Sequence, residues 1–142
     1  MDALTLGALV YWAYKLVEFG NSAFTGDGAV DGGAGNGSKG LIGKDFEDYL
    51  TKEIGGNGSF SKGGRDFDGG IGNRWWEAKS GKYWDMLEND PSQLAKFKSD
   101  MGDRLRIAKD NGATYELFSN TSIPQSIKDW LTQKGILFTE IN

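Results

Sequence analysis

The glycine-rich tract between residues 20 and 40 sets the strongest limit on how this 142-residue chain folds. It holds eight glycines, with Asn, Asp and Ser among them. Because glycine loses more backbone entropy on ordering than any other residue, such a tract is costly to fix in one conformation. No Gly-Lys-Ser/Thr sequence follows a strand-like run, so the tract does not fit a phosphate-binding P-loop. We interpret residues 20–40 as a flexible linker and expect one ordered domain over residues 41–142.

The segment before the linker is almost wholly apolar at residues 3–14, ALTLGALVYWAY, and the run continues through LVEF at residues 16–19. Twelve such residues are too few to span a bilayer, and no basic stretch with a small-residue cleavage site marks a signal peptide. Two interpretations of residues 1–19 stay open. They form a helix packed on a neighbouring unit, or they are the end of a membrane-translocating segment in a longer polypeptide.

Two residue types that carry much enzyme chemistry are missing, because the sequence has no histidine and no cysteine. This excludes disulfides, thiolate metal sites and any catalysis by imidazole. Catalysis must use carboxylates, lysine, tyrosine, a hydroxyl group or a metal ion. The net charge of −4 is unlike that of a protein that coats nucleic acid, although 10 of the 16 Lys and Arg residues fall within residues 58–112.

Apolar spacing and turn residues predict six segments of regular structure. In chain order these are a helix at 46–54, a hairpin with strands at 58–68 and 74–79 around a GGIGN turn, a helix after Asp90-Pro91-Ser92 up to Asn111, a strand at 115–119, a helix at 124–134 and a strand at 136–141. The alternation of strands and helices favours an α/β fold, with a mixed β-sheet flanked by helices.

Charged residues gather around the GGIGN turn. Glu77 and Lys79 are two positions apart on one predicted strand, so their side chains share a face. Asp66 and Asp68 likewise share a face of the preceding strand. Asp68 is nearer the turn, so we expect it beside Glu77, which leaves Asp66 to pair with Arg65, Arg74 or solvent.

Two carboxylates that converge on one point repel each other, and a divalent cation relieves the repulsion. Oxygen ligands from Asp and Glu suit Mg²⁺ or Mn²⁺, with Zn²⁺ as an alternative. Such an ion polarises a phosphoryl oxygen and activates water, and a neighbouring lysine orients that water or stabilises developing charge. Asp68, Glu77 and Lys79 therefore fit phosphodiester hydrolysis.

This pattern, Asp68 followed by Glu77-Ala-Lys79 on the next strand and preceded by a helix that contains Phe46-Glu47, resembles the PD-(D/E)xK superfamily of restriction-endonuclease-like nucleases. The resemblance covers residues 41–142, because the order of helices and strands also matches that core. It implies that Asp68 and Glu77 bind the metal, that Lys79 activates the nucleophile and that Glu47 completes the metal site.

Some positions leave alternatives open. Phe67 stands where the family pattern has proline, a difference that does not touch a ligand. Glu53 competes with Glu47 as the acid of the first helix. The alternative interpretation of Asp68, Glu77 and Lys79 is that they lie on an exposed hairpin and only keep it soluble.

The aromatic and basic residues of the middle third also allow two interpretations each. The aromatic residues Trp75, Trp76, Tyr83 and Trp84 fit either core packing or a platform on which unpaired bases stack. The cations fit either a phosphate-binding track or a solvated face, and they are Arg65, Arg74, Lys82, Lys96, Lys98, Arg104, Arg106 and Lys109.

The order of apolar segment, glycine-rich linker and C-terminal nuclease is similar to the toxin end of bacterial polymorphic toxins, as in contact-dependent growth inhibition. The resemblance implies delivery from the surface of the producing bacterium, action in the target-cell cytoplasm and a cognate immunity protein. Its substrate would be DNA, slightly favoured, or tRNA, and we expect no stable membrane insertion of the nuclease domain. The rival functions are a non-catalytic binding module for protein or nucleic acid, and a housekeeping repair or restriction nuclease.

Overall fold

The computed structural model describes residues 37–141, so the predictions for the apolar segment and for most of the linker lie outside the described residues. Its elements, in chain order, are α3 (Lys44–Ile54), β1 (Phe60–Lys62), β2 (Arg65–Phe67), β3 (Gly69–Ile71), β4 (Arg74–Lys79), α4 (Tyr83–Asn89), α5 (Pro91–Asp110), β5 (Thr114–Ser119), α6 (Gln125–Lys134) and β6 (Leu137–Glu140).

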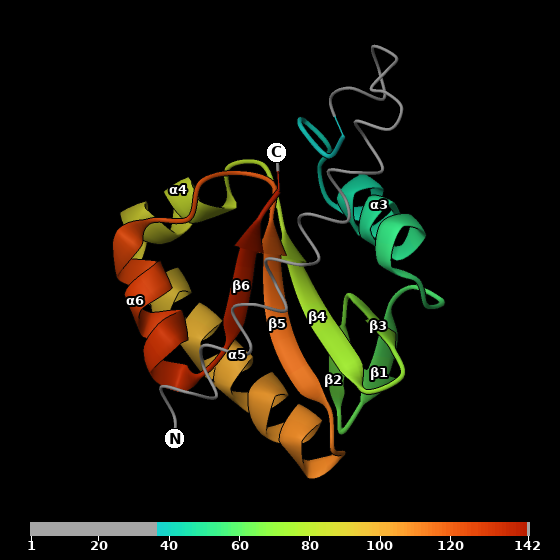
Figure 1. Ribbon diagram of the computed structural model, residues 1–142. Coiled ribbons are helices and arrows are strands. Elements are labelled where there is room, and N and C mark those ends of the chain that lie inside the picture. The colour runs from blue at the N-terminus through green and yellow to red at the C-terminus, as the bar shows by residue number, and fades with distance from the viewer. Residues whose placement is uncertain (1–36, 142) are drawn as a thin grey trace.

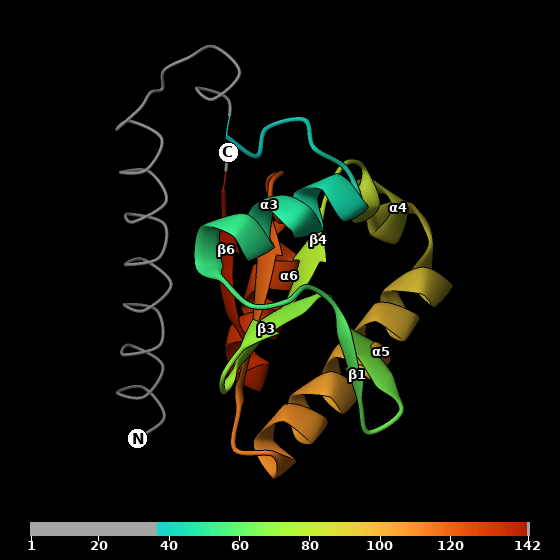
Figure 2. The same cartoon turned by 90° about the vertical axis from the view of Figure 1, so that its right-hand side faces the viewer.

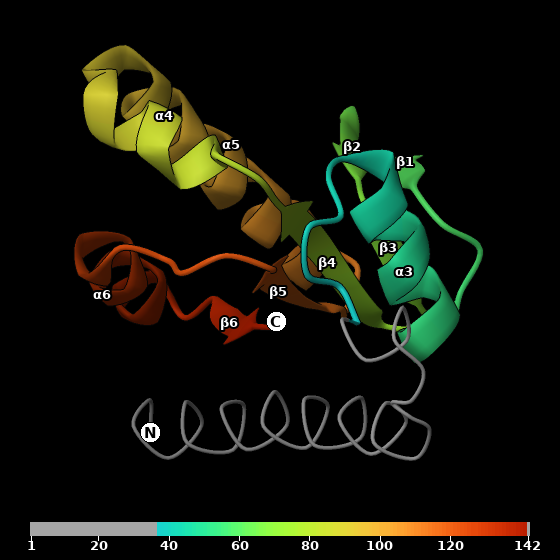
Figure 3. The ribbon, with the colours of Figure 1, turned by 90° about the horizontal axis from the view of Figure 1, so that it is seen from above.

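The main sheet has four strands in the order β3-β4-β5-β6 and is mixed. Strand β3 is antiparallel to β4, while β4, β5 and β6 run parallel to one another. Helix α3 lies on one face of this sheet, and α4, α5 and α6 lie on the other (Figure 1; Figure 3). The predicted α/β fold with a mixed sheet flanked by helices is thus confirmed. Among residues 37–141, no helix is long and apolar enough to cross a lipid bilayer.

Alternation along β4 divides the core between the two faces of the sheet. Trp75 joins the larger cluster, on the side of α4, α5 and α6. Trp76 is fully buried in the smaller cluster with Phe46 and Leu50 of α3 and Phe118 of β5. Trp75, Trp76 and Trp84 are all buried, which confirms core packing for these three and removes them as a base-stacking platform.

The segment before β4 differs from the predicted hairpin. Residues 58–68 do not form one strand, because Gly63 and Gly64 turn the chain at positive φ and fold β1 back on β2. Phe60 and Phe67 pair across this small hairpin, and their stacked rings lie 5.2 Å apart. The glycines predicted as a turn instead form β3, and the chain reverses at Gly72-Asn73 (Figure 2).

Glycine is required in β3 because the strand runs close against an indole ring. A Cβ atom at Gly69 would lie 2.4 Å from Nε1 of Trp76, which is much closer than van der Waals contact. The sequence pattern predicted these glycines as turn formers, and only Gly72 has that role. Gly69 makes room for Trp76, and Gly70 makes room for the ring of Phe60.

Helix α4 was absent from the prediction. It has only seven residues, too few to show a clear period, and it is held by the burial of Trp84 and Leu87. It is followed directly by α5, where the predicted cap is confirmed because the Asp90 carboxylate accepts hydrogen bonds from the backbone N–H groups of Ser92 and Gln93.

Candidate active site

Asp68 lies between β2 and β3 and is tied to β4 by two hydrogen bonds. The Asp68 N–H donates to the Trp76 carbonyl oxygen at 3.1 Å, and the Ala78 N–H donates to Asp68 Oδ2 at 2.8 Å. These bonds hold the Asp68 carboxylate beside the strand that carries Glu77 and Lys79. The structure therefore brings together the three residues that the sequence placed around one point.

Glu77 occupies the most enclosed position of the cluster, with only 5% of its surface exposed. Its Oε2 lies 3.1 Å from Lys79 Nζ, and its Oε1 lies 3.8 Å from Arg104 Nε. Oε1 has no hydrogen-bond partner within the described part of the chain. Burial, followed by the negative charge of Asp68, raises the pKa of Glu77 from 4.5 to about 7, against the opposing effects of Lys79 and Arg104. The protein therefore encloses a carboxylate whose charge its own cations do not fully balance.

Glu47 of α3 lies close enough to Glu77 and Asp68 for their charges to affect one another's pKa values. Burial raises the pKa of Glu47, and the negative charge of Glu77 raises it further. Burial also raises the pKa of Asp68, where the Ala78 N–H opposes the shift and the charge of Glu47 adds to it. However, within residues 37–141 no three acidic side chains are grouped closely enough to form a ready metal-ligand set. The role of Glu47 as a third ligand therefore stays a prediction.

Lys79 is held as a cation. Its side chain is 19% exposed, and Nζ lies 4.2 Å from the centre of the Tyr83 ring, in cation–π geometry. Burial acts to lower the pKa of Lys79, but the Glu77 carboxylate and the electron-rich Tyr83 outweigh it, so the pKa is raised overall. Lys79 is thus an ammonium at neutral pH and supplies fixed positive charge rather than a base.

Arg104 is a further member of the cluster, where the sequence predicted only a phosphate-binding track or a solvated face for this residue. Its side chain is 16% exposed, and Nε donates a 2.7 Å hydrogen bond to the Asp66 carbonyl oxygen. One signal could have found it, because Arg104 lies seven residues after Phe97 and three after Met101, on the buried side of α5. An arginine at that spacing must be partly buried beside the sheet.

Asp66 pairs with neither Arg65 nor Arg74, and its side chain is exposed to solvent, which was the third predicted alternative. Its carboxylate accepts a hydrogen bond from the Ser61 hydroxyl across the β1–β2 hairpin. Arg65 forms ion pairs with Asp100 and Asp103 of α5, which the hairpin faces. Arg74 instead forms an ion pair with Glu116 of the adjacent strand β5. These partners are far away in sequence, so strand alternation alone could not identify them.

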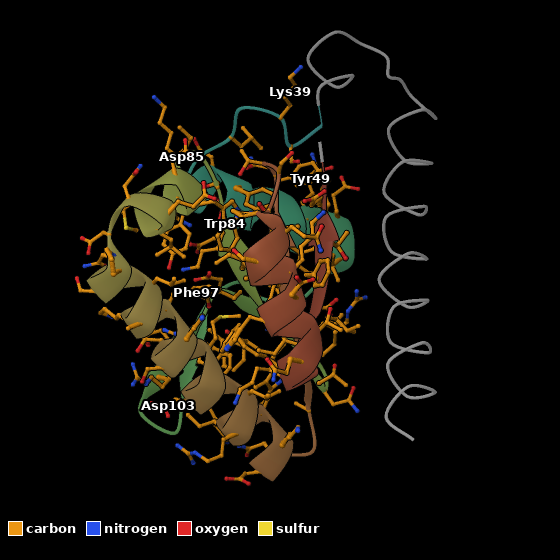
Figure 4. All side chains as sticks on the ribbon, turned by 90° about the vertical axis from the view of Figure 1, so that its left-hand side faces the viewer. Lys39, Tyr49, Trp84, Asp85, Phe97 and Asp103 are labelled. Carbon is orange, nitrogen blue, oxygen red and sulfur yellow. The ribbon has the colours of Figure 1, made fainter. Side chains whose placement is uncertain are left out.

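A pocket of about 270 Å³ opens beside the cluster, between β4 and the α4–α5 segment. It shares Glu77, Lys79 and Arg104 with the candidate centre. The rest of its lining comes from the two helices, and consists of Tyr83, Gln93, Lys96, Phe97, Asp100 and Met101. Figure 4 labels Trp84 of α4 and Phe97 of α5, whose ring centres lie 5.5 Å apart.

The burial of Glu77 predicts an inverse dependence of stability on pH. Between pH 4.5 and about 7 the folded chain keeps a proton on Glu77, whereas the unfolded chain has released it, so rising pH favours the unfolded state. The free energy of unfolding should fall over this window by an amount on the order of 3 kcal/mol and change no further above it. Denaturant titrations in EDTA measure the loss. Glu77→Gln should remove most of it and leave the smaller contributions of Asp68 and Glu47, whose pKa values are also raised. An undiminished loss in that variant would refute the assignment.

Comparisons of the chain with protein-family models, with curated proteins and with solved structures found no match in any of the three.

Proposed function

We propose that residues 41–142 form a metal-dependent nuclease with a restriction-endonuclease-like core, which hydrolyses phosphodiester bonds in DNA or tRNA. The observation that carries the proposal is the buried Glu77 carboxylate, whose Oε1 has no hydrogen-bond partner in residues 37–141 and which lies beside Asp68 and Lys79. Burying an anion costs free energy unless positive charge nearby compensates it. A bound cation would provide the compensation that Glu77 lacks.

The donor set fits a hard divalent cation. Asp68 and Glu77 would hold it, because Mg²⁺ and Mn²⁺ are often bound by one or two carboxylates together with water. Zn²⁺ is a weaker match, since its usual nitrogen and sulfur ligands are absent from the sequence. When bound, the cation would supply Lewis-acid polarisation of a phosphoryl oxygen and activation of the attacking water.

The residues of the chain have separate roles in this proposal. The Ala78 N–H orients the Asp68 carboxylate through Oδ2, and Oδ1 would ligate the cation. Lys79 places a fixed positive charge where negative charge develops on the phosphoryl group. Arg104 orients Glu77 from α5 and anchors the β1–β2 hairpin through the Asp66 carbonyl oxygen.

The order of elements supports the finer fold assignment. Helix α3, the short strands, β4, α5 and β5 follow one another in the order that the resemblance implies, and β4 carries the Glu-x-Lys pair parallel to β5. Two elements are additional to that order: the β1–β2 hairpin, which lies between α3 and β3, and the short helix α4, which lies between β4 and α5.

The acid on α3 gives a paired prediction. Glu47→Gln should lower the cleavage rate by about 10- to 100-fold, the range expected when a group that supports a metal site is lost. Glu53→Gln, the matched change later on the same helix, should leave the rate within about two-fold. Single-turnover cleavage assays compare the two variants. A larger effect of Glu53→Gln would assign the supporting role to the other acid.

The direct test is cleavage of plasmid DNA and of total tRNA, side by side, with Mg²⁺, Mn²⁺ or Zn²⁺ and with EDTA. Cleavage of one pool that EDTA abolishes supports the proposal and names the substrate. Metal binding has an independent readout, because an ion at 100 times its Kd should stabilise the wild type by about 2.7 kcal/mol but not Glu77→Gln. No cleavage and no metal-dependent stabilisation would favour the binding-module alternative.

The biological part of the proposal is an interbacterial toxin that acts in the target-cell cytoplasm and is neutralised by an immunity protein. It rests on the resemblance of the whole chain, including residues outside the described part. Expression in a bacterial cytoplasm should stop growth, and the Lys79→Ala variant should not. Harmless expression of an enzyme that is active in vitro would favour the housekeeping nuclease instead.

A further inference from the structure

We infer that the pocket beside the active-site cluster binds one unpaired nucleotide of the substrate strand. The inference rests on the proposed nuclease function and deepens it, because it names the structural state of the nucleic acid that is cut. Three lining residues, Glu77, Lys79 and Arg104, belong to the cluster, so any group in the pocket is adjacent to the bond that reacts.

The size of the pocket suits a single base. Its volume of about 270 Å³ is room for several water molecules at ~30 Å³ each, and so for a group the size of one base. Enzymes that act on a nucleotide inside such a pocket use single-stranded substrate or draw the nucleotide out of the duplex.

The chemistry of the walls suits a nucleobase. Tyr83 is half-buried and presents its aromatic ring to the pocket, while Phe97 is buried against it with ring centres 6.0 Å apart and so supports that ring from behind. Gln93, exposed in the first turn of α5, offers both a donor and an acceptor to a base edge. Aromatic faces beside an amide and a lysine are the groups by which proteins hold unpaired bases.

The charge distribution argues against a broad duplex-binding surface. Six of the ten cations of residues 58–112 form ion pairs with acids of the chain: Arg65, Arg74, Lys79, Lys96, Arg104 and Arg106. Each such pair reduces the charge that is available to phosphates, and non-specific affinity for a duplex depends on that charge. Affinity must therefore come from a local site, and the pocket is that site in the described residues.

The test measures binding in EDTA, where metal-dependent cleavage cannot interfere. Labelled hairpins with an unpaired loop are compared with fully paired duplexes of the same stem, each as RNA and as DNA. We expect the looped form to bind about ten-fold tighter or more, which is the effect of holding one stacked base. Whether the RNA loop or the DNA loop binds more tightly shows which nucleic acid supplies the nucleotide.

Two variants on α5 localise the effect. Gln93→Trp fills the mouth of the pocket and should remove the preference for the loop, whereas Ala95→Trp, an equally exposed position outside the lining, should retain it. Thermal melting checks that both variants fold. Equal affinity for looped and paired forms, or an undiminished preference in Gln93→Trp, would overturn the inference. If the loop binds but is not cleaved in Mg²⁺ or Mn²⁺, the binding role of the pocket is supported and the proposed nuclease function is rejected.

Discussion

Glu77→Gln is expected to lower phosphodiester cleavage by about 10³-fold or more while the domain stays folded. The substitution keeps the size of the buried side chain and removes the charge that would hold the cation together with Asp68. Folding tolerates the change because the buried charge is itself unfavourable, as the pKa of about 7 indicates. Single-turnover cleavage at saturating metal, with a denaturant titration of the same sample, measures both properties.

A second buried glutamate provides the matched control. Glu116 is 2% exposed and pairs with Arg74 on β4, whose side chain is 24% exposed. Glu116→Gln should destabilise the fold by about 1–3 kcal/mol, because it leaves the arginine without its charged partner, and should leave cleavage within a few-fold. Activity that survives in Glu77→Gln and disappears in Glu116→Gln would show that the reaction centre is elsewhere.

Lys79→Met is expected to lower the cleavage rate by about 10²- to 10³-fold. Methionine preserves much of the apolar stem of lysine but removes the ammonium that lies 3.1 Å from Glu77 Oε2 and 4.2 Å from the centre of the Tyr83 ring. Because Lys79 opposes the upward pKa shift of Glu77, its loss should also move that pKa higher. The pH window over which stability falls should therefore extend upward, a change that the denaturant titrations detect.

The control for this change is Lys134→Met, at an exposed lysine in the last turn of α6 outside the cluster. It removes the same charge and should leave both the rate and the pH window unchanged within error. Full activity in Lys79→Met would mean that the lysine serves only to balance Glu77, and that the positive charge for the reaction comes from another residue.

Local rules predicted the elements that depend on neighbouring residues. The Asp90 cap and Pro91 fixed the start of α5, and alternation on β4 separated Glu77 and Lys79 from Trp76 and Ala78. The predicted proximity of Asp68 to this pair is also confirmed, because β3 pairs with β4 through a tight turn.

Features that depend on distant segments could not be predicted in this way. Glu77 is buried because α5 packs beside β4, and the Glu77–Arg104 contact between them joins residues 27 positions apart in the sequence. The same packing brings in Arg104 and pairs Arg65 with α5. The sequence did not predict the β1–β2 hairpin. The stacking of Phe60 on Phe67 depends on the contact of both rings with Trp75, which comes from a later strand.

The hydrogen bond from the Ala78 N–H to Asp68 Oδ2 joins two residues only ten positions apart, and so makes the acidic pair a local product of one short chain segment. Most of the remaining pocket wall comes from a different segment, the helices α4 and α5 that follow it. In the proposed nuclease, the metal-binding acids and most of the base contacts would therefore be encoded in separate parts of the chain. Substitutions at the outer pocket residues Gln93 and Lys96 would then change the preferred nucleic acid and leave the acidic pair intact.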